Sequence, residues 1–264
     1  MNFVETSLLR VGYQEFNPAS PNVVILLHGW PDSPRTWKGV IPYLVDAGYR
    51  VIVPALRGFS PTTFLRDDTP RTGQLTALGR DLIELIDALN LHRPVVVGHD
   101  WGARAVAVAN GLQPGVSSHM VMISVGYGAN AANQVMSMAQ SKNYWYQWFM
   151  NTPRGCDAVR NDRYALAKIM WDTWAPSGWY ELEEFNETAQ AFENPDWPEV
   201  VIQSYTQRWG LSPSDPHYAE DEKRLQPTPM ISIPTLILHG EEDGATLTET
   251  SANKEAFFSG PYKR

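Results

Sequence analysis

Val95-Val96-Val97-Gly98-His99-Asp100-Trp101-Gly102-Ala103-Arg104 is the stretch that decides the fold of this chain. It predicts a buried strand that runs into a sharp turn and then into a helix. Gly98 and Gly102 carry no side chain, so the turn can close tightly around Asp100. The Asp100 carboxylate then lies at the carboxyl edge of a sheet, where open α/β folds bind ligands, and at a helix N-terminus, which favours an ionised acid. The alternative interpretation of Asp100 is an ordinary helix N-cap.

Short apolar runs of the same kind recur along the chain and predict further strands. Runs that are apolar on both faces suit a parallel sheet covered by helices. One amphipathic helix, with leucines at helical spacing from Leu75 to Leu89, lies between two of these runs. We therefore expect an α/β fold with a mainly parallel sheet flanked by helices. The predicted strands are 23–27, 50–53, 95–97, 120–125 and 235–238.

The regular alternation stops after about Gly126 and returns near residue 228. The intervening chain is rich in Trp, Tyr, Met and acidic residues, and it shows helical patterns at about 157–171 and 198–209. We expect residues 1–126 and 228–264 to form the core. Residues 127–227 are then a helical cap inserted between two strands of the sheet.

Composition excludes several classes of function. The net charge is −8 and no long basic run is present, which argues against nucleic acid as a partner. No apolar stretch is long enough to span a bilayer, and the first residues lack the pattern of a signal peptide. The single cysteine, Cys156, fits a reducing compartment. We expect a cytoplasmic protein without a membrane segment, and we predict neither a metal site nor a cofactor.

His28-Gly29-Trp30-Pro31 directly follows the predicted strand 23–27. Together with the stretch around Asp100, it resembles the α/β-hydrolase superfamily, in the branch of epoxide hydrolases and dehalogenases with an Asp nucleophile. The resemblance covers nearly the whole chain from about Val11. It implies that Asp100 attacks an electrophilic carbon and that the backbone N–H groups of Trp30 and Trp101 form an oxyanion hole. His28 is expected either to contact substrate or to pack the loop.

The resemblance implies further catalytic residues in two other segments. Asp243, just past the predicted strand 235–238, matches the acid that orients a catalytic histidine, although a surface turn is the alternative. In the cap, Tyr146 and Tyr205 match the two tyrosines that protonate the epoxide oxygen in epoxide hydrolases. Tyr144 competes with Tyr146 for this role, and packing is the alternative role for all of these aromatic residues.

Three functions remain open, and epoxide hydrolysis of a small apolar or aromatic substrate is the first. The second is a haloalkane or haloacid dehalogenase, because Gln147 and Trp148 resemble the haloacid dehalogenase cap and Arg104 matches a carboxylate-binding Arg of those enzymes. Trp101 stands where their partner Arg would be, which weakens the haloacid version. Trp101 and Trp148 could instead bind a halide. The third is a non-catalytic pseudo-hydrolase that binds a ligand under the cap.

The catalytic histidine that the resemblance implies is missing from this sequence. The family carries a histidine beyond the acid, after the last strand, and no residue after His239 is a histidine. We expect the last strand to begin near Tyr262, so most of that strand and the final helix are missing. This predicts a truncated or cleaved form, or a second chain or segment that supplies the strand and the histidine. Alkylation of Asp100 needs no base, whereas hydrolysis of the resulting ester does.

Overall fold

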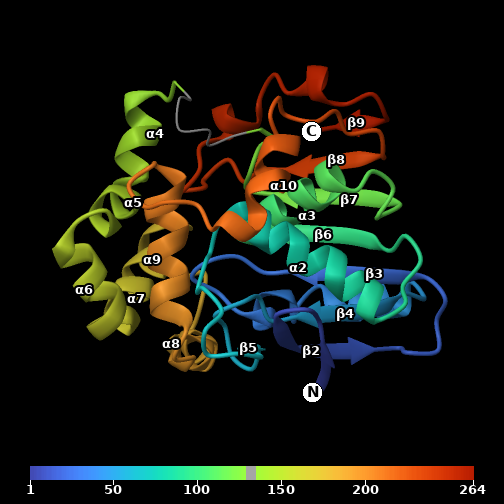
Figure 1. Cartoon of the computed structure of the whole chain (residues 1–264), viewed down its shortest axis with the longest axis horizontal. Coiled ribbons are helices and arrows are strands. Elements are labelled where there is room, and N and C mark those ends of the chain that lie inside the picture. Colours follow the sequence, from blue (N-terminus) through green and yellow to red (C-terminus); the bar gives the residue numbers. More distant parts are fainter. Residues whose placement is uncertain (129–134) are drawn as a thin grey trace.

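The computed structural model describes residues 1–128 and 135–264, and within these ranges nine strands form one sheet (Figure 1). The strand order is β1-β2-β4-β3-β6-β7-β8-β9, with β5 paired to β2. Every pairing from β4 across to β9 is parallel, and β2 is antiparallel to its neighbours. The strands are β1 (Asn2–Glu5), β2 (Leu9–Phe16), β3 (Val23–Leu27), β4 (Arg50–Pro54), β5 (Thr63–Phe64), β6 (Val95–His99), β7 (His119–Ile123), β8 (Thr235–Leu238) and β9 (Tyr262–Lys263).

All five predicted strands are present, so the predicted mainly parallel sheet is confirmed. β3 and β8 have the predicted bounds, and β9 begins at Tyr262 as expected. The antiparallel strands β1, β2 and β5 were not predicted. In β2, buried Leu9 and Val11 alternate with exposed Arg10, so one face packs on the core and one faces solvent. This strand therefore lacks the continuous apolar run of the parallel strands.

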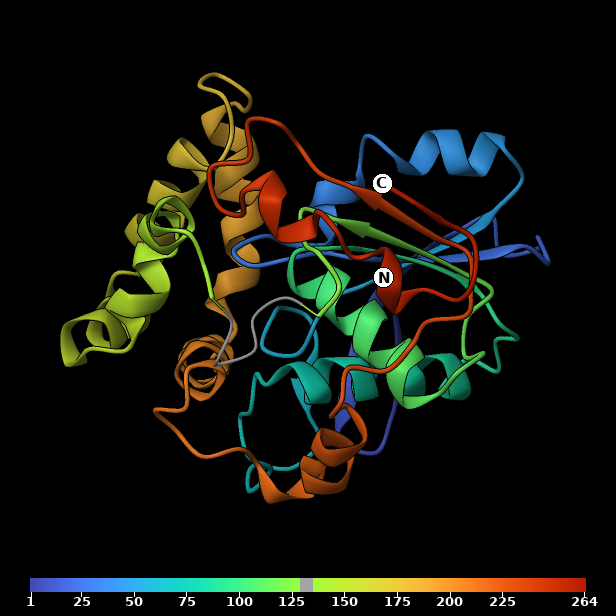
Figure 2. The same cartoon turned by 90° about the horizontal axis from the view of Figure 1, so that it is seen from above.

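Alternate residues of the central strands pack against helices on the two faces of the sheet. Leu26 of β3 packs on the side of α1 (Ile41–Asp46), whereas Ile25 packs on the side of α2 (Leu75–Ala88) and α3 (Trp101–Leu112). Figure 2 shows α1 above the sheet and α3 below it. The longest helix described, α2, has 14 residues, and none of the described helices is long and apolar enough to cross a membrane. The cytoplasmic location stays a prediction.

Between β7 and β8, the described residues from 138 to 224 are mainly helical, as expected for an inserted cap. In Figure 1, α4 to α9 lie together on one side of the sheet. The expected helix at 157–171 is two helices that break at Asp162. The helices are α4 (Met138–Asn143), α5 (Trp145–Met150), α6 (Pro153–Asn161), α7 (Arg163–Thr173), α8 (Leu182–Ala189), α9 (Trp197–Arg208) and α10 (Ala219–Arg224).

The last part of the predicted cap packs on the core. Arg80 of α2 forms an ion pair with Asp221 of α10, and Gln74 donates a hydrogen bond of 3.0 Å to Glu222. α10 therefore lies beside a core helix, although it precedes the predicted boundary at residue 228. Residues 129–134 of the predicted cap lie outside the described residues, and the domain boundaries stay predictions.

Candidate active site

Asp100 occupies the turn between β6 and α3, as the sequence predicts. It is the N-cap residue of α3, with φ 48° and ψ −110°, a conformation that residues other than glycine rarely adopt. Its backbone N–H donates to the Ile123 carbonyl on the neighbouring strand β7 at 3.2 Å. Strained backbone of this kind clusters at functional sites, and here it holds the carboxylate beyond the strand end.

Two glycines let the chain pass closely around Asp100. A Cβ on Gly98 would lie 2.2 Å from the Gly102 backbone, and a Cβ on Gly102 would lie 2.3 Å from the Leu27 carbonyl oxygen. Both distances are far below van der Waals contact, and both neighbours are backbone atoms. The predicted tight turn is therefore confirmed, and it requires glycine at these two positions.

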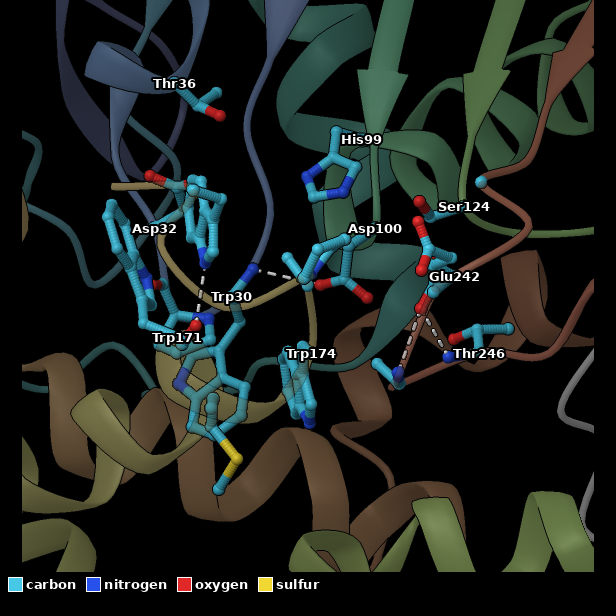
Figure 3. A pocket seen from close by; sticks show the side chains of 18 of the residues that line it. Trp30, Asp32, Thr36, His99, Asp100, Ser124, Trp171, Trp174, Glu242 and Thr246 are labelled. Atoms are coloured by element: carbon cyan, nitrogen blue, oxygen red, sulfur yellow. Dashed lines mark hydrogen bonds between the residues drawn. The ribbon is translucent and has the colours of Figure 1, made fainter. Parts of the chain in front are cut away.

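A backbone donor from the first motif reaches the Asp100 carboxylate. The Trp30 N–H donates to Asp100 Oδ1 at 2.9 Å, which Figure 3 draws as a dashed line. Trp101 is the first residue of α3, where a backbone N–H has no partner within the helix. The structure thus brings Trp30 to Asp100 as predicted and starts α3 at Trp101. Two donors so placed can stabilise negative charge that develops on a carboxyl oxygen.

A cavity of about 720 Å³ opens beside Asp100. In the view of Figure 3, Trp171 and Trp174 lie on one side of Asp100, and Ser124, Glu242 and Thr246 lie on the other. The walls combine indole rings with acidic groups, a lining that suits an apolar or aromatic ligand. The aromatic and acidic residues of the wall are Trp30, Trp171, Trp174, Trp179, Asp32, Asp100, Glu241, Glu242 and Asp243.

Asp243 shares this cavity with Asp100, as the sequence predicts. Its Oδ1 accepts hydrogen bonds from the backbone N–H groups of Ala245 at 2.9 Å and Thr246 at 2.8 Å. Its Oδ2 lies 3.7 Å from Nε2 of His239, whose side chain is buried outside the cavity wall. The carboxylate is therefore fixed by its own loop, and His239 does not stand between Asp243 and Asp100.

The cavity wall also contains Asp32 and His99, which the sequence did not single out as site residues. Among the described residues, His99 is the only histidine in this wall, and its buried Nδ1 has no hydrogen-bond partner. Burial raises the pKa of Asp32 from 3.8 to about 6, against the smaller opposing effect of a backbone N–H from Ser33. In the sequence, only their positions could have indicated that these residues lie in the site. Asp32 follows the Trp30-Pro31 pair, and His99 precedes Asp100.

Tyr146 and Tyr205 from the cap are both buried and lie against each other, with ring centroids 5.5 Å apart. Both rings contact the Trp30 indole, at centroid distances of 5.6 and 5.3 Å. Gln147 Nε2 donates to the Tyr146 hydroxyl at 2.8 Å, and Trp101 Nε1 donates to the Tyr205 hydroxyl at 3.1 Å. Each hydroxyl oxygen thus accepts one bond and keeps its own proton to donate. Neither tyrosine forms part of the 720 Å³ cavity wall.

Both phenols are held in the neutral form. Burial is the largest cause that raises the pKa of Tyr146, and the neighbouring Tyr144 and Asp100 raise it further. Burial, Tyr146 and Asp100 likewise raise the pKa of Tyr205 well above 10.0. Tyr144 is buried beside Tyr146, with ring centroids 6.1 Å apart, so the two remain alternatives for a role at Asp100.

His28 lies outside the cavity and joins two loops. Its Nε2 accepts a hydrogen bond of 3.1 Å from the Leu56 N–H, and its Nδ1 lies 2.9 Å from the Gly29 carbonyl. Burial lowers the pKa of His28 to about 4, so the ring is neutral and Nδ1 donates to the carbonyl. This geometry matches loop packing rather than the expected contact with substrate.

The other expected substrate-binding residues also lie away from the cavity. Gln147 is buried behind Tyr146, where its Oε1 accepts from Trp209 Nε1 at 2.9 Å. Trp148 is half-exposed, and its indole N–H donates to the Ser141 carbonyl at 2.8 Å. Arg104 is buried one helical turn beyond Asp100 and lines a second cavity. The structure therefore gives Gln147 a role in holding Tyr146, and it does not bring Trp148 to Asp100.

Comparison with known proteins agrees with the fold and with the order of the motifs. The family model of the alpha/beta hydrolase fold matches residues 22–260. Epoxide hydrolase A of Mycobacterium tuberculosis is 32% identical over 161 residues, which are 60% of this chain and 49% of that protein. An epoxide hydrolase of Caballeronia sordidicola is 40% identical over 95 residues, which are 36% of this chain and 27% of that protein. The matched segments thus span about half, or less, of these relatives.

Solved structures give the same result over the whole chain. A candidate epoxide hydrolase from Klebsiella pneumoniae superposes with a TM-score of 0.94 at 35% identity, over 99% of this chain and 87% of that one. Epoxide Hydrolase A of Mycobacterium thermoresistibile has a TM-score of 0.70 at 20% identity, over 99% of this chain and 88% of that one, and supports the fold alone. This chain therefore belongs to the α/β-hydrolase fold family of enzymes, in its epoxide hydrolase branch.

Proposed function

We propose that this protein opens epoxides through a covalent ester on Asp100. One observation carries the proposal: Asp100 is presented on a strained turn, beside a large cavity, with Oδ1 bound by the Trp30 N–H. A carboxylate in this setting is exposed to an electrophile, and it needs no base to act as a nucleophile. The epoxide hydrolases among the relatives support the choice of substrate class.

The first half-reaction uses Asp100 together with Tyr146 and Tyr205. A carboxylate oxygen of Asp100 forms a bond to an epoxide carbon while the bond from that carbon to the ring oxygen breaks. The electron pair stays on the oxygen, which takes a proton from Tyr146 or Tyr205. A phenol can protonate an alkoxide because the alkoxide is far more basic. The raised pKa values of both tyrosines keep that proton in place until the ring opens.

The second half-reaction releases a diol and needs a base. Water adds to the carbonyl carbon of the Asp100 ester, and the oxyanion that forms receives the N–H groups of Trp30 and Trp101. We propose that Asp243 orients a histidine base, which a second chain or segment supplies. In support of this, Asp243 faces the same cavity as Asp100.

A dehalogenase is the second candidate. The two indoles expected to bind a halide are engaged elsewhere, because Trp101 Nε1 donates to Tyr205 and Trp148 Nε1 donates to Ser141. One observation favours this candidate: Trp30 Nε1 is buried and has no hydrogen-bond partner within the described ranges, so it is a donor that a halide could use. Asp100 would attack carbon in the same way, with halide as the leaving group.

Two electrophiles separate these functions. The purified protein is incubated with styrene oxide or with 1-bromobutane, and the intact mass and the released bromide are measured. We expect a covalent adduct with styrene oxide, and neither an adduct nor bromide with 1-bromobutane. Bromide release together with an adduct from 1-bromobutane alone would show that the leaving group is a halide. Absence of any adduct from either compound would favour the pseudo-hydrolase that binds a ligand under the cap.

A further inference from the structure

A second cavity, of about 710 Å³, lies between α3, the end of α9 and the segment that follows α10. Among the described residues, it shares no wall residue with the cavity beside Asp100. Much of its wall is apolar, and two arginines, Arg104 of α3 and Arg208 of α9, also belong to it. The apolar side chains of the wall include Leu75, Ala107, Val108, Met122, Val125 and Leu225.

Arg208 is a buried cation that forms no ion pair with any described residue, although the negative charge of Asp100 acts on it. Arg208 is 7% exposed. Its Nε and Nη2 atoms have no hydrogen-bond partner in the part of the chain that the structure describes. It takes part in no ion pair there, and its guanidinium carbon lies 4.9 Å from the centre of the Tyr205 ring. Burial of an unpaired charge is costly, so such a group is normally found with an anion.

Arg104 brings a second positive charge to the same cavity. It is 5% exposed and follows Asp100 by one helical turn, as Arg208 follows Tyr205. Burial lowers the pKa of Arg208, and the charge of Arg104 lowers it further. Two guanidinium groups near enough to repel each other form a site that one anion can stabilise with charge-assisted hydrogen bonds.

The carboxylate that belongs to the described part of this wall is bonded to other residues. Glu222 lines the cavity, but its Oε1 accepts hydrogen bonds from Gln74 Nε2 and from Thr76 Oγ1. Within residues 1–128 and 135–264, no ion pair joins Glu222 to Arg208. Glu222 is therefore fixed to α2 and does not serve as the counter-ion of Arg208.

We propose that Arg208, together with Arg104, binds the carboxylate of a small organic acid whose apolar part fills this second cavity. A planar guanidinium matches a carboxylate through paired N–H bonds, and the unpartnered Nε and Nη2 atoms of Arg208 form one such fork. The apolar wall favours a carboxylate with a hydrocarbon body over a fully hydrated inorganic anion. The proposal concerns binding and does not depend on turnover at Asp100.

Binding is tested by thermal unfolding of the whole chain with octanoate, and with octanol as the neutral ligand of similar shape. The variants are Arg208→Met, Arg208→Lys and the control Arg154→Met, which removes an exposed arginine. We expect octanoate, but not octanol, to raise the melting temperature of the unmodified protein and of Arg154→Met. Arg208→Met should lose the shift, and Arg208→Lys should keep a weaker one, because its ammonium lacks the planar fork.

The unliganded variant supplies an independent readout. Arg208→Met should melt no lower than the unmodified protein, because the substitution removes a buried charge that forms no ion pair with the described residues. An octanoate shift that persists in Arg208→Met, an equal shift with octanol, or no shift at millimolar octanoate would each overturn the proposal. None of these results bears on Asp100, so the proposed function would stand.

The acid can be part of the substrate or a separate ligand, and a second experiment distinguishes the two. Alkylation of Asp100 is timed with an ω-epoxy fatty acid and with its methyl ester. If the substrate supplies the carboxylate, the acid should react roughly tenfold to a hundredfold faster than the ester, and Arg208→Met should remove the difference. Equal rates, together with octanoate binding, would assign the site to a separate acid.

Discussion

Asp32 is a carboxyl group whose pKa is raised in the folded protein. Its pKa is raised from 3.8 to about 6, mainly by burial, so the folded protein binds this proton more tightly than the unfolded chain does. A raised pKa contributes stability below the unfolded value, and that contribution is lost as pH rises through the folded value. Ionised Asp32 therefore costs the protein stability in the neutral range, beside the cavity where Asp100 lies.

We expect Asp32→Asn to stabilise the protein at pH 8 and to have little effect at pH 4. The gain in stability should appear as pH rises between the unfolded pKa of 3.8 and the folded pKa of about 6. Above the upper value the gain should be about 2 kcal/mol. Asparagine keeps an acceptor for the Ser33 N–H, which is 2.7 Å from Asp32 Oδ1. Urea unfolding at the two pH values measures the difference. An equal effect at both would show that the titration of Asp32 is not the cause.

Tyr146 and Tyr205 should affect the rate of alkylation by an epoxide but not by an alkyl halide. We expect Tyr146→Phe and Tyr205→Phe each to slow alkylation by an epoxide by about 10²-fold or more, because the ring oxygen needs a proton. Any residual reaction with an alkyl halide should be unchanged, since a halide leaves without one. Rates of adduct formation measure this effect.

Tyr164→Phe is the matched control, because Tyr164 is 44% exposed and belongs to the outer surface of the cap. It should leave the rate of adduct formation unchanged. An unchanged rate of epoxide alkylation in Tyr146→Phe and Tyr205→Phe would assign both tyrosines to packing instead.

At the scale of the element, the turn from β6 to α3 depends on close backbone contact. We expect Gly102→Ala to destabilise the protein by about 1–3 kcal/mol or more, because the added methyl group would meet the Leu27 and His28 carbonyl groups. These neighbours are backbone atoms of β3 and its loop, which cannot turn away. Urea unfolding measures the loss.

Gly39→Ala provides the control for that measurement, since a Cβ on Gly39 meets nothing within 4 Å. Its free energy of unfolding should stay within about 0.5 kcal/mol of that of the unmodified protein. If Gly102→Ala behaved like Gly39→Ala, the turn would not be as tightly packed as the structure shows.

The parallel strands could be predicted because each is buried on both faces, which leaves an uninterrupted apolar run such as Val23–Leu27. β1 could not, because most of its residues are exposed and its place depends on pairing with β2. Likewise, nothing local shows that α10 is held to α2 by the Arg80–Asp221 pair, whose members lie 141 residues apart in sequence. Long-range contacts of this kind decide where a helical segment packs.

At the scale of the whole molecule, the candidate site forms where the loops after the strands meet α7, one of the helices between β7 and β8. Asp100 and Asp243 could be predicted, because each directly follows an identifiable strand and such strand ends share one edge of the sheet. The roles of Gln147 and Trp148 could not, since neighbouring positions on one short helix face different directions, and their side chains bond to Tyr146 and Ser141 respectively. The second cavity could not be predicted either, because Arg104 and Arg208 are far apart in sequence.

The account depends most on Asp100 as the group that reacts. The measurement that tests it most directly is the intact mass of the protein after incubation with styrene oxide, followed by peptide mapping of the adduct. We expect one added epoxide per chain, located on Asp100, and none in Asp100→Asn, whose amide is a poor nucleophile. An adduct that maps to another residue, or that persists undiminished in Asp100→Asn, would contradict it.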